Sequence, residues 1–146
     1  MLSDPSRAAL STPTRLVARI LVAGVHAPTM RAVNYARALG IADTRAIFFA
    51  FDNEEAAQLR RDWAAAGDPI PLDVDDAYHR DLGPPILRHV RSLTADGSTA
   101  VNVLLPELVL RGPARVLHNH RALFFKRLLL FEEQVILSSI PYQLFR

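Results

Sequence analysis

The stretch "VLHNHRALFFKRLLL" (116–130) combines two histidines, an asparagine and a basic pair, the side chains with the most scope for chemistry. In a helix, which turns by about 100° per residue, His118 and His120 point about 200° apart and cannot chelate one metal ion. The polar face of this helix would comprise Arg111, Arg115, His118, Asn119, Ala122 and Lys126. The opposite face, which we expect in the core, comprises Leu117, Phe124, Leu128 and Phe131. The polar face fits either a solvated surface or a strip that binds an anion or faces a membrane.

Other candidate side chains follow the apolar runs of the chain. His26 comes directly after "RILVAGV" (19–25), Asp52 after "RAIFFAF" (45–51), and Glu107 after Pro106. Each has two interpretations: His26 contacts a ligand or is an ordinary loop histidine, Asp52 contacts a ribose or base or starts a helix, and Glu107 accepts a ligand hydrogen bond or repels anions. The predicted ligand-binding set is Val25, His26, Thr29, Asp52, Pro106, Glu107, Arg111, His118, Asn119 and Lys126.

Catalytic motifs are missing from the sequence. It has no G-x-S-x-G, Walker, G-x-G-x-x-G or H-E-x-x-H motif, and Ser138 and Ser139 have no base near them in sequence. The acids of "DVDD" (73–76) are spaced as solvated acids at a strand end usually are, and the chain has no cysteine to serve as a thiolate ligand or nucleophile. We therefore expect no catalytic residue, no metal and no enzymatic activity.

The elements that must position these side chains alternate along the chain. Apolar, β-rich runs predict strands with cores at 20–25, 45–52, 70–76, 99–107 and 135–139, and Pro71 places the third near an edge. Helices are predicted at 26–40, 53–67 (with Asn53 as N-cap), 82–97 and from about Pro113 to 130. This order predicts an α/β fold: a doubly wound, open, parallel five-stranded sheet of the Rossmann-like kind, with helices on both faces.

Length and composition fit one domain. The 146 residues divide into a polar leader or linker (1–15) and a single α/β domain (16–146). A net charge of +2 does not indicate a nucleic-acid-binding protein but suits an anionic ligand or an anionic membrane surface. The leader has no apolar run of signal-peptide length, and no run approaches the roughly 18 apolar residues that span a bilayer. In an open parallel sheet, ligands bind beyond the carboxyl ends of the strands, where Thr29 also begins a helix whose N–H groups can face a phosphate.

Several motifs, taken in order, resemble a known family. They are "RILVAGVHAPTMRAVNYARAL", "FDNEEAAQLRRDW", "VLLPELVLRGPARVLHNHRALFFKRLLL" and "VILSSIPYQL". From about residue 16 onward the chain resembles a universal stress protein domain (adenine nucleotide alpha hydrolase-like), most closely the cytosolic C-terminal domain of bacterial amino acid–polyamine–organocation permeases. The resemblance implies a regulatory domain on the cytoplasmic side of the bacterial inner membrane. Its implied partner is the transmembrane permease domain of the same full-length chain. It also implies a homodimer through the last strand, Val135, Ile136, Leu137, Ser138 and Ser139.

The resemblance also implies a ligand class, because some relatives bind adenine nucleotides and some transporter-attached ones bind cyclic di-AMP. ATP-binding relatives carry an aspartate after the first strand, where this chain has His26 or Ala27, and a G-x2-G-x9-G-[S/T] motif after the fourth, where it has only Gly112. These departures favour cyclic di-AMP over ATP, or no ligand. The expected function is thus a regulatory domain of an amino-acid or cation permease; the alternative is a free-standing universal stress-type nucleotide-binding protein.

Overall fold

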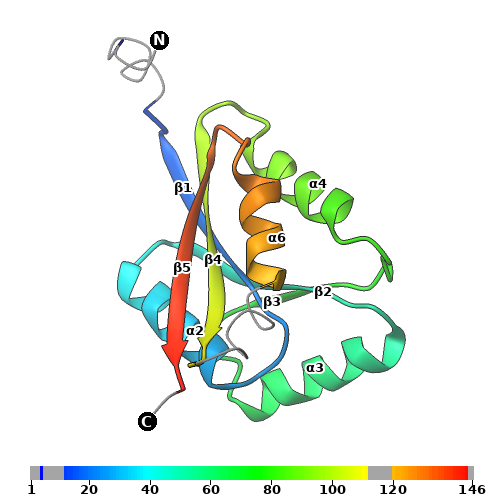
Figure 1. Cartoon of the computed structure of the whole chain (residues 1–146). Coiled ribbons are helices and arrows are strands. Elements are labelled where there is room, and N and C mark those ends of the chain that lie inside the picture. The colour runs from blue at the N-terminus through cyan, green and yellow to red at the C-terminus, as the bar shows by residue number, and fades with distance from the viewer. Residues whose placement is uncertain (1–3, 5–11, 112–119, 145–146) are drawn as a thin grey trace.

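The computed structural model describes residue 4 and residues 12–111 and 120–144, and in them strands and helices alternate along the chain (Figure 1). The strands are β1 (Arg15–Leu21), β2 (Asp43–Phe49), β3 (Leu72–Asp75), β4 (Thr99–Val109) and β5 (Val135–Gln143). The helices are α2 (Ala27–Leu39), α3 (Asn53–Ala65), α4 (Gly83–Thr94) and α6 (His120–Leu129). The predicted alternation is confirmed.

All five strands form one open sheet in the order β3-β2-β1-β4-β5, and every pairing is parallel. The order reverses between β1 and β4, where the chain first builds outward through β2 and β3 and then returns to the other side of β1. β3 and β5 are the edge strands, as Pro71 predicted for the former. This is the predicted doubly wound, Rossmann-like α/β architecture.

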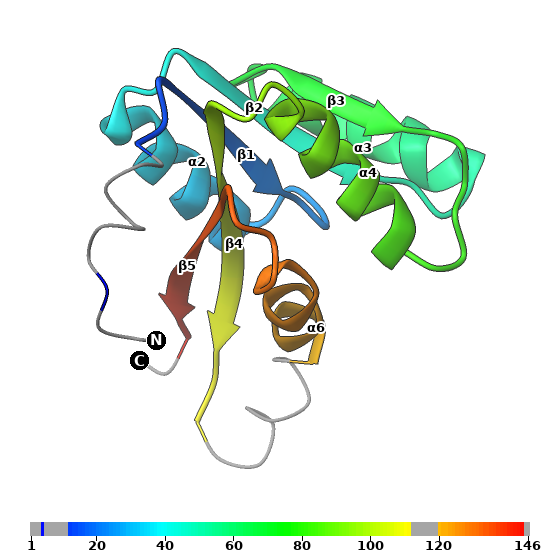
Figure 2. The same cartoon turned by 90° about the horizontal axis from the view of Figure 1, so that it is seen from above.

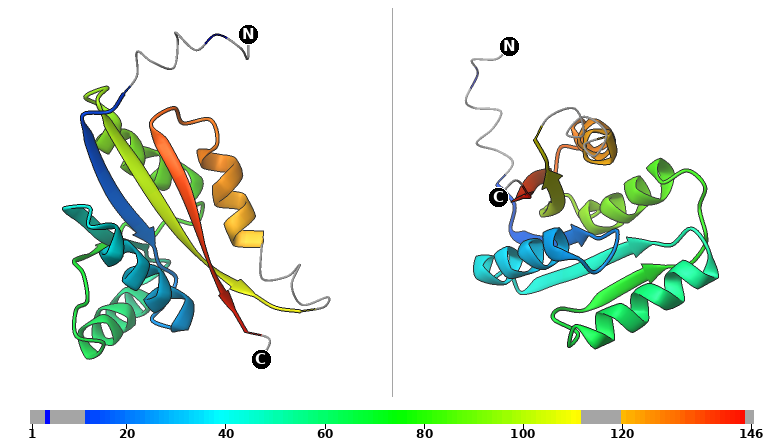
Figure 3. Two further views of the ribbon diagram at one scale, coloured as in Figure 1. Left: turned by 90° about the vertical axis from the view of Figure 1, so that its left-hand side faces the viewer. Right: turned by 60° about the horizontal axis from the view of Figure 1, so that its bottom comes forward.

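Two helices cover each face of the sheet (Figures 2 and 3). α2 and α3 pack on one face in a cluster with Val33, Leu59 and Trp63, and the indole of Trp63 donates to the carbonyl of Ile70 at 2.9 Å. α4 and α6 pack on the other face in a cluster that includes Ile86, Val90, Val101, Phe125 and Leu129. Apolar residues on both faces of β1 and β4 are what a parallel sheet buried on both sides requires.

Capping residues set the ends of the helices. Asp52, not the predicted Asn53, is the N-cap of α3: its carboxylate accepts the Glu55 N–H at 2.8 Å, and Glu55 accepts in turn from the N–H of Phe51. Gly40 ends α2 in the left-handed conformation (φ 68°), which glycine adopts without a steric penalty. Pro28 and the Pro84–Pro85 pair occupy first-turn positions of α2 and α4, as predicted.

Two sequence-based strand boundaries were wrong. β1 spans Arg15–Leu21 and ends inside the predicted core of 20–25, so Val22–Val25 form the loop. β5 continues four residues beyond Ser139 to Gln143, through Pro141. An edge strand tolerates proline because an N–H that faces solvent is not needed by the sheet.

The predicted phase of the fourth helix was also wrong. Ala122, Phe125 and Leu129 are its buried residues, whereas Phe124 is 44% and Phe131 82% exposed. His118 and Asn119, which belonged to the predicted polar face, lie outside the described residues. Among the helices that the structure describes, each is too short or too polar to cross a bilayer.

Candidate functional site

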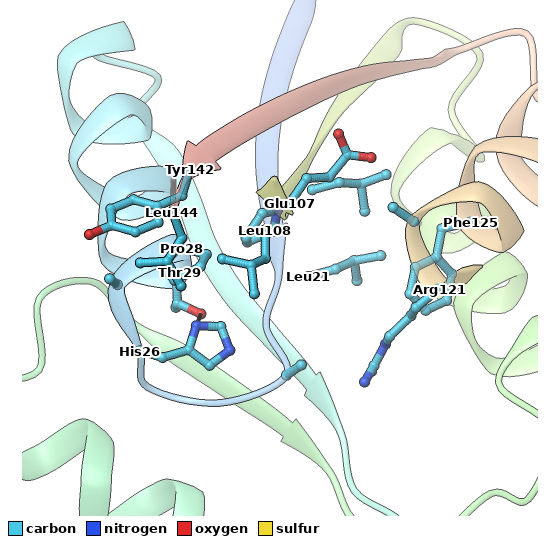
Figure 4. A pocket seen from close by; sticks show the side chains of 15 residues that line it. Leu21, His26, Pro28, Thr29, Glu107, Leu108, Arg121, Phe125, Tyr142 and Leu144 are labelled. Carbon is cyan, nitrogen blue, oxygen red and sulfur yellow. Dashed lines mark hydrogen bonds between the residues drawn. The ribbon is translucent and has the colours of Figure 1, made fainter. Parts of the chain in front are cut away.

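A cavity of about 560 Å³ lies at the carboxyl ends of β1 and β4, on the point where the strand order reverses. Leu21 and Leu105 come from the ends of these strands, the N-terminus of α2 forms one wall and α6 the other (Figure 4). Tyr142 and Leu144, from the end of β5, complete the lining. Open parallel sheets bind their ligands at this place, and the volume falls within the range of small-molecule sites.

His26 and Thr29 build the wall at the start of α2. The buried Thr29 Oγ1 donates its one hydrogen to the carbonyl of Gly24 at 2.6 Å, so its contact at 3.3 Å with His26 Nδ1 must be one in which the ring nitrogen donates. The Nε2 of a neutral His26 is therefore free to accept a hydrogen bond. Within the part of the chain that the structure describes, nothing accepts from the backbone N–H of Ala27 or Thr29, and Pro28 between them has no N–H.

Arg121 and Phe125 of α6 form the opposite wall (Figure 4). The Arg121 guanidinium lies 5.6 Å from the centroid of the Phe125 ring, a cation–π distance. Desolvation by surrounding protein lowers the pKa of Arg121 from its ordinary value, and attraction to Glu55 opposes the shift. An arginine side chain is not deprotonated at neutral pH in proteins, so the group remains a cation. The cavity thus has an apolar interior with one cation on its wall.

Glu107 joins three elements at the rim of the cavity. From β4 it pairs with Lys126 Nζ of α6 at 2.6 Å and accepts a hydrogen bond from the Ser139 hydroxyl of β5. Its side chain is 13% exposed, so both carboxylate oxygens are satisfied in a largely dry setting. Glu107 thereby links β4 to α6 and β5. The ammonium group of Lys126 also neutralises much of the negative charge that Glu107 would otherwise present to an anion.

The structure brings only part of the predicted ligand-binding set to this cavity. His26, Thr29, Pro106 and Glu107 line it, and Lys126 adjoins it through Glu107. The others lie elsewhere: Val25 packs from the loop against the core, Asp52 caps α3, and Arg111 is exposed beyond β4. His118 and Asn119 are outside the described residues.

Sequence reasoning missed five lining residues of consequence: Leu21, Arg121, Phe125, Tyr142 and Leu144. Arg121 and Phe125 were missed because of the wrong phase of α6. Tyr142 and Leu144 were missed because the last strand was ended at Ser139. In the structure β5 pairs with β4 as far as Gln143, which lies opposite Val109.

A second polar cluster lies between the sheet and α4, at the half of the sheet away from the cavity. Arg19 of β1 pairs with Asp43 at 2.9 Å, and Arg45 of β2 pairs with Asp73 at 2.7 Å. These hydrogen bonds are the main reason why the pKa values of Asp43 and Asp73 lie below their ordinary value. His89 of α4 adjoins them, and burial followed by repulsion from Arg19 lowers its pKa. We call these five residues the arginine–aspartate cluster.

The lining of the cavity suits the binding of a small molecule. In the residues described here, no group of three or more histidines and acids is placed to hold a metal ion. The apolar interior suits a planar or aliphatic group, while Arg121 and the first N–H groups of α2 suit a negative charge. The helix N-terminus adds to Arg121 because both attract anions.

Comparison with known proteins adds the identity of the domain. The family model "KimA potassium transporter C-terminal domain" matches residues 13–142. A relative, the "Potassium transporter KimA" of Bacillus subtilis (strain 168), is 22% identical over 125 residues, which are 83% of this chain and 20% of the relative. The chain therefore spans about a fifth of the length of this curated relative.

These matches confirm the predicted transporter C-terminal domain. The finer expectations of a universal-stress-like domain and of an amino acid–polyamine–organocation permease stay predictions. The match extends from before β1 to Tyr142 of β5, and so includes nearly the whole sheet and every residue that lines the cavity except Leu144. The chain belongs to the family of KimA potassium transporter C-terminal domains.

Proposed function

We propose that this chain is a non-catalytic regulatory domain, on the cytoplasmic side of a bacterial membrane, that controls a potassium transporter by binding an adenine nucleotide in the cavity. The observation that carries the nucleotide part is the cavity itself, at the reversal of strand order between β1 and β4. The family match supports the transporter part, and the name of the relative supports potassium as the cation.

The cavity lining is mostly apolar, with few charged side chains, and this favours a nucleobase as ligand. Leu21, Leu105 and Phe125 provide apolar surface for a flat ring, and Tyr142 adds an aromatic side chain with a hydroxyl. His26 Nε2 is placed to accept from an exocyclic amino group such as that of adenine. A purine base would therefore find both stacking surface and a directional hydrogen bond.

The limited supply of phosphate ligands favours a cyclic dinucleotide over ATP. Arg121 is the one cation among the lining residues that the structure describes, and α2 offers the N–H groups of Ala27 and Thr29. A triphosphate concentrates its charge at one place, whereas cyclic di-AMP spreads two single charges. One arginine and one helix N-terminus fit the second pattern better.

Calorimetric titration of the chain with cyclic di-AMP, ATP and AMP tests the ligand. We expect Arg121→Gln to weaken the binding of cyclic di-AMP by about ten-fold to a hundred-fold, because it removes a charged hydrogen bond. Arg127→Gln on the same helix is the matched control, since Arg127 is exposed and does not line the cavity. If no nucleotide binds at millimolar concentration, or if both variants weaken binding equally, the nucleotide proposal is wrong.

Potassium uptake tests the regulatory part separately. The full-length protein would be assayed in vesicles with and without the nucleotide that binds, with Arg121→Gln as the unresponsive form. The alternative of a free-standing stress-type protein predicts that the coding sequence lacks upstream runs of about 20 apolar residues. Finding such runs would exclude that alternative without any binding measurement.

A homodimer through β5 remains part of the proposal. β5 is an edge strand of nine residues, and Ile136 on it is 53% exposed. A long bare edge with an exposed apolar residue is where a second copy can add its own strand. Light scattering at high concentration should give the dimer mass, and Ile136→Lys should give the monomer. A monomeric mass of the unaltered chain would refute this pairing.

A further inference from the structure

α6 and the turn after it carry apolar side chains on two opposite faces. The inner face comprises Ala122, Phe125 and Leu129, which are 8%, 4% and 1% exposed. The apolar residues on the opposite side are Leu123 (47% exposed), Phe124 (44%), Leu130 (69%) and Phe131 (82%). Leu130 continues the helical pattern, because its N–H bonds the carbonyl of Lys126 at 3.0 Å. Helices of a water-facing surface normally have a polar outer side, so this pattern needs an explanation.

The outer apolar residues form one stripe. At about 100° per residue, Leu123, Phe124, Arg127 and Leu130 fall within about 120° of one another, with Arg127 in the middle, and Phe131 follows in the turn after the helix. We call these five residues the outer face of α6. In Figure 2, where α6 is seen almost end-on, β4 lies on its inner side and α4 on one flank, where the Phe124 ring lies beside Gly83 at the start of α4. No described element covers the remaining side. Clustered exposed apolar side chains of this kind mark an interaction site.

The charge of this segment is positive throughout. Residues 120–131 contain Arg121, Lys126 and Arg127 and no acid. Lys126 is engaged by Glu107, and Arg121 faces the cavity, so Arg127 is the cation that the outer face itself presents. Glu132, which follows, is turned away by its pair with Arg91 at 2.6 Å. An exposed apolar stripe around a cation is complementary to an anionic lipid surface, where the apolar groups enter the boundary and the cation meets phosphate.

A second copy of the chain fits the same face less well. A two-fold contact centred on this stripe would bring Arg127 against the Arg127 of the other copy, and like charges at close range repel. A bilayer imposes no such symmetry. The family match adds that this is the C-terminal domain of a membrane transporter, and about four-fifths of the relative lies outside the matched region.

We propose that the outer face of α6 docks on the surface of an anionic phospholipid bilayer. Leu130 and Phe131, the most exposed of its side chains, would enter the boundary between headgroups and acyl chains, and Arg127 would pair with headgroup phosphates. This inference goes beyond the proposed function and does not require a nucleotide, because the cavity lies on the opposite side of α6. A four-residue stripe binds weakly by itself, so attachment to the membrane protein would raise its occupancy.

The absence of cysteine from the chain allows a clean test. Phe131→Cys would be labelled with an environment-sensitive fluorophore and mixed with vesicles of phosphatidylcholine alone or with phosphatidylglycerol. The matched control is Ala64→Cys, an exposed position on α3, which lies on the other face of the sheet. We expect a blue shift at position 131 with anionic vesicles, reduced by salt, and none at position 64. No shift at position 131, or equal shifts at both positions, would overturn the proposal.

Sedimentation with the same vesicles gives the energetic contribution of each group. Arg127→Glu should lower the partition coefficient on anionic vesicles by about thirty-fold, from about five-fold for each unit of charge. Arg61→Glu, the same change on α3, should leave it unaltered. The double variant Leu130→Ser and Phe131→Ser should abolish sedimentation while the circular dichroism spectrum stays native, because both side chains are exposed. If this variant instead lowers the mass measured by light scattering and leaves sedimentation unchanged, the face binds a second copy and the lipid proposal is wrong.

Discussion

Replacing Asp43 should destabilise the domain more than any other single change to its ion pairs. Asp43 binds two arginines at 2.9 Å, one on each carboxylate oxygen. The Arg15 side chain is 61% exposed, whereas that of Arg19 is 6% exposed. In Asp43→Ala, Arg15 returns to solvent at little cost. Arg19 stays beneath α4 as a buried cation without its carboxylate.

The structure sets the magnitude. Removing one partner of a buried ion pair costs about 3–5 kcal/mol of unfolding free energy. Asp43 is 29% exposed, and the Arg19 guanidinium still donates to the carbonyls of Ala18 (2.9 Å) and residue 43 (3.2 Å). The lower end, about 3 kcal/mol, is therefore expected for Asp43→Ala. The exposed pair with Arg15 adds at most about 1 kcal/mol.

A double-mutant cycle in urea at pH 7 checks this reasoning. Arg19→Met removes the buried charge and keeps an apolar stem, so it should cost about 1 kcal/mol or less. The double variant Arg19→Met, Asp43→Ala should then unfold almost like Arg19→Met, which gives a coupling of about 3 kcal/mol. Arg15→Ala is the control for the exposed pair. If the effects of Arg19→Met and Asp43→Ala simply add, Asp43 does not act by neutralising Arg19 and the argument is refuted.

The same pair makes the stability of the domain depend on acid. Because the hydrogen bond from Arg19 lowers the pKa of folded Asp43, the unfolded chain takes up a proton first as the pH falls. The stabilisation is complete above the ordinary aspartate value of about 4 and is lost as the pH falls through the lowered value. Asp73 behaves alike through Arg45. The unfolding free energy of Asp43→Ala should therefore fall less steeply below about pH 4 than that of the unaltered chain.

Three further outcomes are expected. Burial lowers the pKa of His89, so as the pH falls the unfolded chain takes up a proton at His89 before the folded chain does. Stability should therefore fall from about pH 7 to 5, and urea titrations of His89→Leu should lack this slope. Phe125→Ala should lower the free energy of unfolding by about 3–5 kcal/mol and Phe124→Ala by much less, because the two side chains are 4% and 44% exposed. Equal losses in urea unfolding would contradict the observed orientation of α6. Asp52→Ala should lower the thermal midpoint by an amount equivalent to about 1 kcal/mol, through loss of the bond to the Glu55 N–H, and a variant as stable as the parent would show that this cap is dispensable.

The sheet could be predicted from sequence because its strands are buried on both faces. Runs such as "AIFF" within β2 and "VLL" within β4 are apolar at every position, so a shift of one residue does not change the prediction of a buried strand. The order of elements then leaves few topologies, since parallel crossovers are right-handed. This topology predicted ligand contacts at the carboxyl ends of the strands, and the cavity lies there, beside β1 and β4 but not beside Asp52 after β2.

The lining could not be predicted as well, because it depends on phase and on exact ends. α6 has apolar residues on two faces, so a hydrophobic pattern cannot tell which face meets the sheet: Phe124 and Phe125 look alike in the sequence and differ tenfold in exposure (44% and 4%). Because Phe124 rather than Phe125 was predicted to face the core, the predicted orientation of the helix left Arg121 out of the ligand-binding set. Pro141 suggested that β5 had ended, although an edge strand accommodates it, and so Tyr142 was lost from the set.

Glu107 takes part in both the cavity and the contacts between α6 and β5. Its carboxylate lines the cavity and at the same time ties α6, through Lys126, to the edge strand, through Ser139. A ligand phosphate that attracts Lys126 would compete with Glu107 for it, and β5 would lose one of its links to the helix. Thermodynamic reciprocity then requires the reverse: whatever engages β5 or α6 from outside must alter the affinity of the cavity by the same factor. Binding in the cavity and binding at β5 or α6 would thus depend on each other through the carboxylate of Glu107.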